Sequence, residues 1–126
     1  MQTVLIVDDE QHIRLLIEQT LEALEDDGVE LQTAHDGEEA LGVVAVHHPG
    51  LVFLDVQMPK KNGFEVCEAI KHEPGMGSTK VVLLTARGQA IDRERGLAAG
   101  ADAYLTKPFD PDELLGLARR LLGLAL

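Results

Sequence analysis

The chain has 126 residues, of which 45% are hydrophobic and 26% charged, a composition typical of one compact globular domain rather than a disordered segment. Its net charge of -11 at pH 7 opposes direct binding to nucleic acid, because phosphate backbones repel an acidic surface. It has no apolar run of 18 residues and no basic segment before its apolar start, so neither a membrane span nor a secretory signal is predicted. A cytoplasmic location is therefore expected, and the single cysteine, Cys67, fits a reducing compartment.

Five short apolar segments are predicted to be strands. They are residues 3–7, 29–34, 51–54, 80–86 and 103–105. The first, third and fourth are the most apolar, which indicates strands buried on both faces at the centre of a sheet. The second segment has fewer apolar residues, and these alternate with polar ones, which suits a strand at the edge of the sheet.

A helical pattern follows each predicted strand. Apolar residues recur at three- and four-residue steps over 13–24 and 40–45, and a weaker pattern covers 91–98. Gly63 and Pro111 suit the beginnings of the third and fifth helices. This strict alternation predicts an α/β fold occupying residues 1–126 as one domain, with a doubly wound five-stranded parallel sheet, helices on both faces and right-handed crossovers.

Polar residues stand where the predicted strands end. Asp8 and Asp9 follow the first strand, Asp55 the third, Thr85 lies at the end of the fourth, and Lys107 follows the fifth. The carboxyl ends of parallel strands share one edge of a sheet, and ligands bind at that edge. The sequence therefore predicts that these five side chains form one site around Asp55.

The chemistry of this set points to phosphoryl transfer. Three close carboxylates repel one another unless a cation is present, and Mg²⁺ prefers carboxylate oxygens together with a phosphate oxygen. Lys107 and Thr85 suit the remaining oxygens of a phosphoryl group. An aspartate can itself be the nucleophile and form an acyl phosphate.

Four segments, VLIVDDE, LVFLDVQMPKKNG, VVLLTA and ADAYLTKPF, together resemble the receiver domain of two-component response regulators. The resemblance covers the whole chain and implies a flavodoxin-like fold with strand order 2-1-3-4-5. It implies phosphorelay signalling in which Asp55 accepts a phosphoryl group from a sensor histidine kinase or a phosphotransfer protein. Such a domain is not otherwise an enzyme, since it catalyses only its own phosphorylation and dephosphorylation.

The resemblance also implies roles for single residues. Asp9 and Asp55 would bind Mg²⁺ directly, Asp8 directly or through water, and the backbone carbonyl of Gln57 would be a further ligand. Lys107 would hold a phosphoryl oxygen.

Further implied features concern the switch. The peptide bond from Lys107 to Pro108 is expected to be cis. Thr85 would move toward the phosphoryl group and Tyr104 inward behind it, which reshapes the face made by the fourth helix, fifth strand and fifth helix. A protein partner, or an effector domain outside this chain, would bind that face. Gln57 and Arg87 would set the phosphate's lifetime.

Two alternatives remain at this point. An aspartyl-phosphate hydrolase would normally carry a second aspartate two residues after the nucleophile, where this chain has Gln57. A pseudo-receiver would signal by binding alone, which the complete set of acids, threonine and lysine disfavours. The chain lacks the motif G-x-x-x-x-G-K-[ST], which argues against direct use of ATP, and its five histidines show no metal-ligand spacing and are expected at the surface.

The last helix suggests a contact surface. Its apolar residues cover an arc of about 200°, wider than a surface helix needs, so a surface for self-association or docking is expected. These residues are Leu114, Leu115, Leu117, Ala118, Leu121, Leu122, Leu124 and Ala125. A homodimer through the fourth helix, fifth strand and fifth helix could use Arg93 with Glu113, but Ala103 and Leu117 depart from the family's usual charged pattern. The sequence leaves open whether the chain is a stand-alone receiver or the front of a longer regulator.

Overall fold

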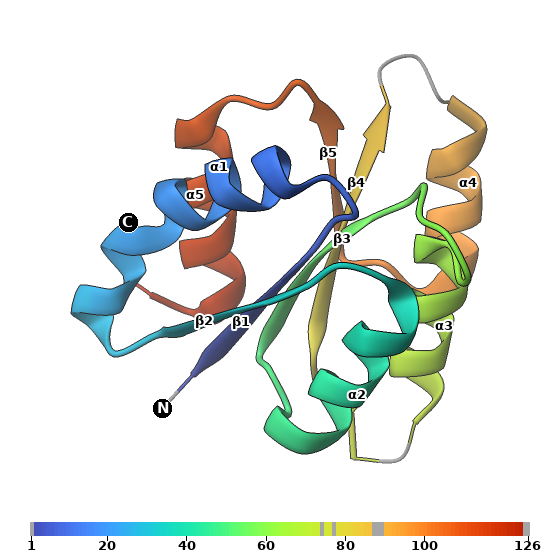
Figure 1. Ribbon diagram of the computed structural model, residues 1–126, viewed down its shortest axis with the longest axis horizontal. Helices are drawn as coiled ribbons and strands as arrows, with labels where there is room; N and C mark the ends of the chain where they lie inside the picture. The colour runs from blue at the N-terminus through green and yellow to red at the C-terminus, as the bar shows by residue number, and fades with distance from the viewer. Residues whose placement is uncertain (1, 74, 77, 87–89, 125–126) are drawn as a thin grey trace.

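The computed structural model describes residues 2–73, 75–76, 78–86 and 90–124, and only the backbone of residues 86 and 90–93. Five strands form one parallel sheet in the order β2-β1-β3-β4-β5 (Figure 1). This confirms the expected fold class and strand order. The strands are β1 (Thr3–Val7), β2 (Glu30–Ala34), β3 (Leu51–Asp55), β4 (Lys80–Ala86) and β5 (Ala103–Lys107).

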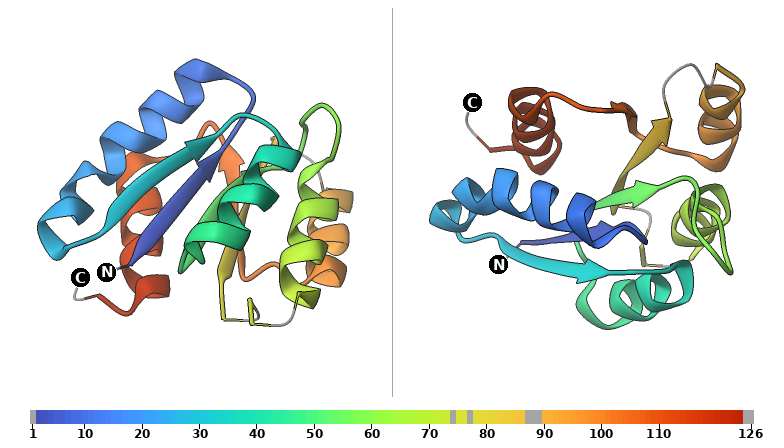
Figure 2. Two further views of the ribbon diagram at one scale, coloured as in Figure 1. Left: turned by 60° about the horizontal axis from the view of Figure 1, so that its bottom comes forward. Right: turned by 45° about the horizontal axis from the view of Figure 1, so that its top comes forward.

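Helices cover both faces of the sheet. Figures 1 and 2 show α1 and α5 along one face and α2, α3 and α4 along the other. The helices are α1 (Gln11–Leu21), α2 (Gly37–His47), α3 (Gly63–His72), α4 (Ala90–Ala99) and α5 (Pro111–Leu122), with a 3₁₀ helix, η1 (Glu22–Asp27), after α1. No helix in the described part of the chain is both long and apolar enough to span a bilayer.

The central strands separate two apolar cores. Side chains alternate along β3, so Val52 and Leu54 join the core under α2, α3 and α4, whereas Leu51 and Phe53 join the core under α1 and α5. Every residue of β3 is buried. This burial on both faces explains why the central strands read as continuous apolar runs.

The first helix differs from its expected form. The pattern over 13–24 predicts one helix, but α1 ends at Leu21 and the chain continues as η1 until Gly28, which has a φ of 79°. The last turn is rich in acids, and carboxylates destabilise the negative end of an α-helix. Because residues three apart in a 3₁₀ helix lie on the same side, Leu21 and Leu24 are both fully buried.

The fifth helix leaves less apolar surface than its 200° arc suggests. Leu114, Leu117 and Ala118 are buried, and the other four leucines up to Leu124 are partly buried against the same core. Helix α1 packs beside α5 and covers part of the arc. Ala125 and the side chain of Arg93 lie outside the described residues, so the predicted pair with Glu113 stays a prediction.

Cys67 is a packing residue of the core. It is fully buried, its Sγ donates to the carbonyl of Ala99 at 3.6 Å, and burial raises the pKa of its thiol to about 11. The five histidines are exposed, which confirms the surface prediction: His12, His35, His47, His48 and His72.

Candidate functional site

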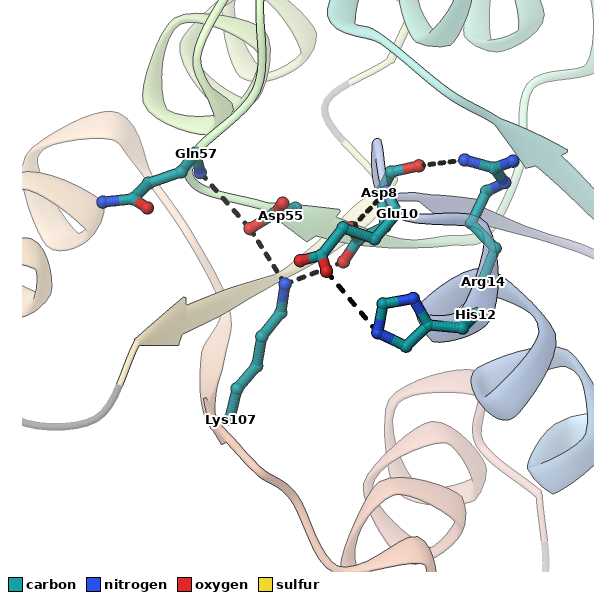
Figure 3. A network of polar contacts seen from close by, with 7 residues as sticks. All are labelled: Asp8, Glu10, His12, Arg14, Asp55, Gln57 and Lys107. Atoms are coloured by element: carbon teal, nitrogen blue, oxygen red, sulfur yellow. Dashed lines mark hydrogen bonds and ion pairs between the residues drawn. The ribbon is translucent and has the colours of Figure 1, made fainter.

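Three predicted site residues meet at the carboxyl edge of the sheet. The Nζ of Lys107 lies 2.8 Å from Oδ2 of Asp8 and 3.2 Å from Oδ1 of Asp55 (Figure 3). Neighbouring registers bring the strand ends together: Val7 pairs with Leu54, one residue before each aspartate. The predicted convergence of Asp8, Asp55 and Lys107 is therefore confirmed.

Asp8 is the most firmly held acid of the site. It is fully buried, its Oδ1 accepts the Glu10 amide at 3.0 Å, and its Oδ2 accepts Lys107. Its backbone carbonyl accepts Nη1 of Arg14 at 2.6 Å. Both carboxylate oxygens are thus already bound within the protein, which fixes Asp8 as a partner of Lys107.

Asp55 lies beside it with little exposure. Its Oδ1 accepts the backbone amide of Gln57 at 3.3 Å, and the residue is 5% exposed. Burial and the charge of Asp8 raise the pKa of Asp55 to about 7, although Lys107 acts to lower it. In the absence of a further cation, the ionised carboxylate of Asp55 is therefore destabilised by its surroundings.

Lys107 keeps its charge in this site. Burial by itself lowers the pKa of an ammonium, but the hydrogen bond to Asp8 and the charges of Asp55 and Asp8 outweigh burial and raise the pKa of Lys107 above its usual value. One ammonium faces two buried carboxylates, so the site retains an excess of negative charge.

The donor set fits a hard divalent cation. Carboxylate oxygens of Asp8, Asp9 and Glu10 lie within 4.8 Å of one another. Asp9, Glu10, Asp55 and Lys107 line one hollow of about 570 Å³ at this edge. Oxygen ligands and uncompensated negative charge are what Mg²⁺ requires.

Two residues near this hollow, Glu10 and Arg14, were not among the predicted site residues. Glu10 directly follows Asp8 and Asp9 in the acidic run after β1. Arg14 was not singled out, because its contact with Asp8 depends on how α1 begins. The run of three acids could have indicated Glu10 as a site residue, whereas nothing in the sequence around Arg14 indicates its contact with Asp8.

A glycine sets how closely α3 approaches Asp55. A Cβ on Gly63 would overlap the backbone carbonyl of Asp55 and lie 2.8 Å from the Cα of Val56. Asn62 caps α3 by accepting the Glu65 amide at 2.9 Å, while the Glu65 carboxylate accepts the Asn62 amide. Gly63 and Asn62 therefore position the loop that follows Asp55.

The expected switch residues lie on neighbouring strands. Thr85 is buried at the end of β4 and pairs in register with Thr106 of β5. Tyr104 packs against the core beneath α4. A Cβ built on Gly96 of α4 would lie 2.5 Å from Cε1 and 2.6 Å from the hydroxyl of Tyr104, so the ring occupies space that only a glycine leaves. Arg87 lies outside the described residues, and the movements of Thr85 and Tyr104 stay predictions.

The model of the response regulator receiver domain matches residues 4–119. The chain belongs to this family. It is therefore a receiver domain of two-component signalling, a family of signal-transduction domains that typically use Mg²⁺.

Relatives and solved structures agree with the family assignment. The chain is 45% identical over 119 residues to the probable transcriptional regulator ycf27 of Cyanophora paradoxa, covering 94% of this chain and 47% of that protein. It is 38% identical over 113 residues to PilG of Pseudomonas aeruginosa, covering 90% and 82%. The chemotaxis response regulator CheY4 of Vibrio cholerae superposes with a TM-score of 0.84 at 36% identity, covering 96% and 98%. The chain spans about half the length of the first curated relatives it matches.

Proposed function

We propose that this receiver domain, extending over residues 1–126, accepts a phosphoryl group on Asp55 from a phosphohistidine of a sensor histidine kinase or a phosphotransfer protein. The observation that carries this proposal is the position of the Lys107 ammonium, 2.8 Å from Asp8 and 3.2 Å from Asp55. A cation between two buried carboxylates at the carboxyl edge is suited to hold a phosphoryl oxygen once Asp55 is modified.

The reaction requires Asp55 in its ionised form. A carboxylate oxygen of Asp55 attacks phosphorus, the bond from phosphorus to the donor's imidazole nitrogen breaks, and the electron pair leaves with the imidazole. Lys107 offsets the charge that gathers on the phosphoryl oxygens, and Thr85 donates its hydroxyl to one of them.

Mg²⁺ would be held by Asp9, Asp55 and the backbone carbonyl of Gln57, with Asp8 contributing directly or through water. When bound, the ion supplies positive charge against the carboxylates and the phosphoryl oxygens. Asp8 already binds Lys107 and the Glu10 amide, which favours the indirect role for Asp8.

The phosphorylated domain would act through its α4-β5-α5 face. Phosphorylation adds roughly -1.5 to -2 charges and three acceptor oxygens, which favours one of two existing arrangements of Thr85 and Tyr104. A protein partner or an effector domain would bind the altered face. This fits the greater length of relatives such as PhoP of Bacillus subtilis, named an alkaline phosphatase synthesis transcriptional regulatory protein.

Two further features belong to the proposal. Binding to nucleic acid falls to another part or partner, because this domain is strongly acidic. We place the reaction in the cytoplasm, where a free thiol such as Cys67 stays reduced.

Self-association through α4-β5-α5 or α5 is also part of the proposal. It is tested by light scattering with and without phosphorylation, and a monomer in both states would exclude it.

A comparison of Asp55→Asn with the unmodified chain tests the proposed acceptor. Both proteins are exposed to acetyl phosphate and Mg²⁺, and acid-labile phosphate is measured. We expect label on the unmodified chain and none on Asp55→Asn, whereas Asp112→Asn, the same change on the exposed first turn of α5, should label normally.

Other results would contradict the proposal. Undiminished label on Asp55→Asn would exclude Asp55 as the acceptor. Turnover of a phosphomonoester would favour a hydrolase, although Gln57 stands where its second aspartate belongs. Absence of label together with failure to bind Mg²⁺ would favour a pseudo-receiver.

A further inference from the structure

A second hollow adjoins the candidate phosphorylation site. It has a volume of about 450 Å³ and is lined by Asp9, Gln57, Asn62 and Arg95 together with apolar side chains of the loop after β3. Asp9, Val56 and Gln57 also line the hollow that contains Asp55 and Lys107. The two hollows therefore share part of their lining, beside Asp55.

Arg95 is the cation that α4 contributes to this hollow. Its guanidinium carbon lies 4.3 Å from the centre of the Phe64 ring, and the ring itself is buried at the start of α3. Stacking on an aromatic face fixes the plane of a guanidinium and leaves the N–H groups at its edge available. Apart from this ring contact, Arg95 forms no ion pair or hydrogen bond with the part of the chain that the structure describes.

Charge differs between the two hollows. Asp9, Glu10 and Asp55 outnumber Lys107 in the first, so an anionic donor meets repulsion there until a metal ion is bound. In the second, Arg95 balances Asp9, and the side-chain amides of Gln57 and Asn62 add neutral donors. A guanidinium binds a carboxylate through two parallel N–H bonds, so the second hollow suits a small carboxylate.

We propose that Arg95 and its hollow form a subsite for the carboxylate leaving group of a small acyl phosphate, an inference that rests on Asp55 being the phosphoryl acceptor. A carboxylate oxygen of Asp55 attacks phosphorus, the bond from phosphorus to the acyl oxygen breaks, and the electron pair leaves on a carboxylate such as acetate. Charge and atoms balance without a proton or an oxidant. Arg95 stabilises the negative charge that appears on the departing carboxylate.

The subsite makes a distinction between donors. A phosphohistidine releases an imidazole and phosphoramidate releases ammonia, so neither offers a carboxylate to Arg95. The subsite therefore favours acyl phosphates over donors whose leaving group is a nitrogen base.

The test compares Arg95→Ala and Arg95→Lys with the unmodified chain. The initial rate of phosphorylation is followed by intact-protein mass against the concentration of acetyl phosphate, and separately of phosphoramidate, at fixed Mg²⁺ and ionic strength. Arg120→Ala, an exposed arginine of α5, removes the same charge elsewhere and serves as the control. Circular dichroism is used to check that each variant is folded.

We expect Arg95→Ala to lower the rate constant for phosphorylation by acetyl phosphate by about fivefold, the size of effect expected for a solvent-exposed charge pair. The rate constant with phosphoramidate should stay nearly unchanged. Arg95→Lys should fall between, because lysine keeps the charge but not the planar pair of donors. Arg120→Ala should match the unmodified chain with both donors.

Three outcomes would overturn the subsite. They are an equal loss with both donors, no loss with either, or an equal loss in Arg120→Ala. If the unmodified chain takes no label from either donor, or Asp55→Asn is still labelled, the proposed acceptor itself is wrong. Label on Asp55 with one of the first three outcomes contradicts the subsite alone.

Discussion

Asp55 carries a charge that its surroundings oppose. Two carboxylates share one ammonium, since Lys107 lies within 3.2 Å of Asp55 and 2.8 Å of Asp8. Each carboxylate also accepts one backbone amide, but Asp8 has the shorter contact both with its amide donor and with Lys107, so Asp55 is the less well stabilised of the two. A site arranged in this way is less stable when empty than it is with a cation or a modified Asp55.

Replacing Asp55 by Asn should stabilise the metal-free protein. The pKa of Asp55 is raised to about 7, so the folded state favours the protonated form. Protonated Asp55 therefore contributes to the free energy of unfolding. This contribution is complete below the unfolded pKa of Asp55, near 4, and is lost as the pH rises through the folded pKa of about 7. Asn stays neutral, so at pH 7.5 the variant should be more stable by about 1 kcal/mol, a value that allows for solvent screening in the open hollow.

Urea unfolding in the presence of a chelator measures this difference. The difference in unfolding free energy between Asp55→Asn and the unmodified chain should shrink as the pH falls from 7.5 and vanish below about pH 4, where Asp55 is protonated in both the folded and the unfolded state. A variant that is equally or less stable at pH 7.5 would show that Asp55 is not under electrostatic strain.

Helices α3 and α4 connect the site to the rest of the fold. The start of α3 touches the backbone of Asp55 through Gly63, and α4 lies over Tyr104 through Gly96. Both contacts depend on the absence of a side chain. They link the end of β3 and the start of β5 to helices on the same face of the sheet.

Gly63→Ala should destabilise the protein by about 2 kcal/mol, because overpacking against a fixed backbone costs of that order. The methyl group would overlap the Asp55 carbonyl, which cannot move without displacing the end of β3. Gly42→Ala on α2 is the matched control, since nothing lies within 4 Å of its added Cβ, and it should be neutral or slightly stabilising. Urea unfolding of both variants decides; a loss below about 0.5 kcal/mol for Gly63→Ala would contradict the close approach.

Gly96→Ala should expel the Tyr104 ring from its place under α4. The added methyl group would lie 2.5 Å from the ring, closer than any real contact. Tyr104 is the only tyrosine and the chain has no tryptophan, so its fluorescence reports on this ring. Acrylamide quenching should increase in Gly96→Ala but not in Gly116→Ala, whose Cβ meets no atom within 4 Å; equal quenching of the two would mean that the ring stays in place.

Much of the fold and the core of the site could be predicted from the sequence. Continuous apolar runs such as 51–54 report burial on both faces, and acids at strand ends report the ligand-binding edge. The 3₁₀ helix after α1 was not predictable, because Leu21 and Leu24, three residues apart, face the core in an α-helix and in a 3₁₀ helix alike. Arg14 and Arg95 were missed because an isolated arginine shows no period, and its partners depend on how helices pack.

The net charge of -11 at pH 7 makes the stability of the folded protein sensitive to cations. Ordinary salt should raise stability slightly by screening repulsion among acids. Mg²⁺ should do more, because a ligand that binds only the folded state stabilises it by mass action.

Thermal unfolding in MgCl₂ and in NaCl of equal ionic strength separates these two effects. We expect a higher midpoint in MgCl₂ for the unmodified chain, and no such excess for Asp9→Asn, which removes an expected ligand. Equal midpoints in the two salts, or an excess that persists in Asp9→Asn, would contradict a specific magnesium site at this edge.

Chemical trapping of the phosphoryl group tests the central claim most directly. Borohydride reduces an acyl phosphate on aspartate to homoserine, and peptide mass spectrometry then locates that residue after treatment with acetyl phosphate and Mg²⁺. We predict homoserine at position 55 and an unmodified Asp8 and Asp9. Homoserine at either of those neighbours in place of position 55, or at no position, would contradict Asp55 as the phosphoryl acceptor.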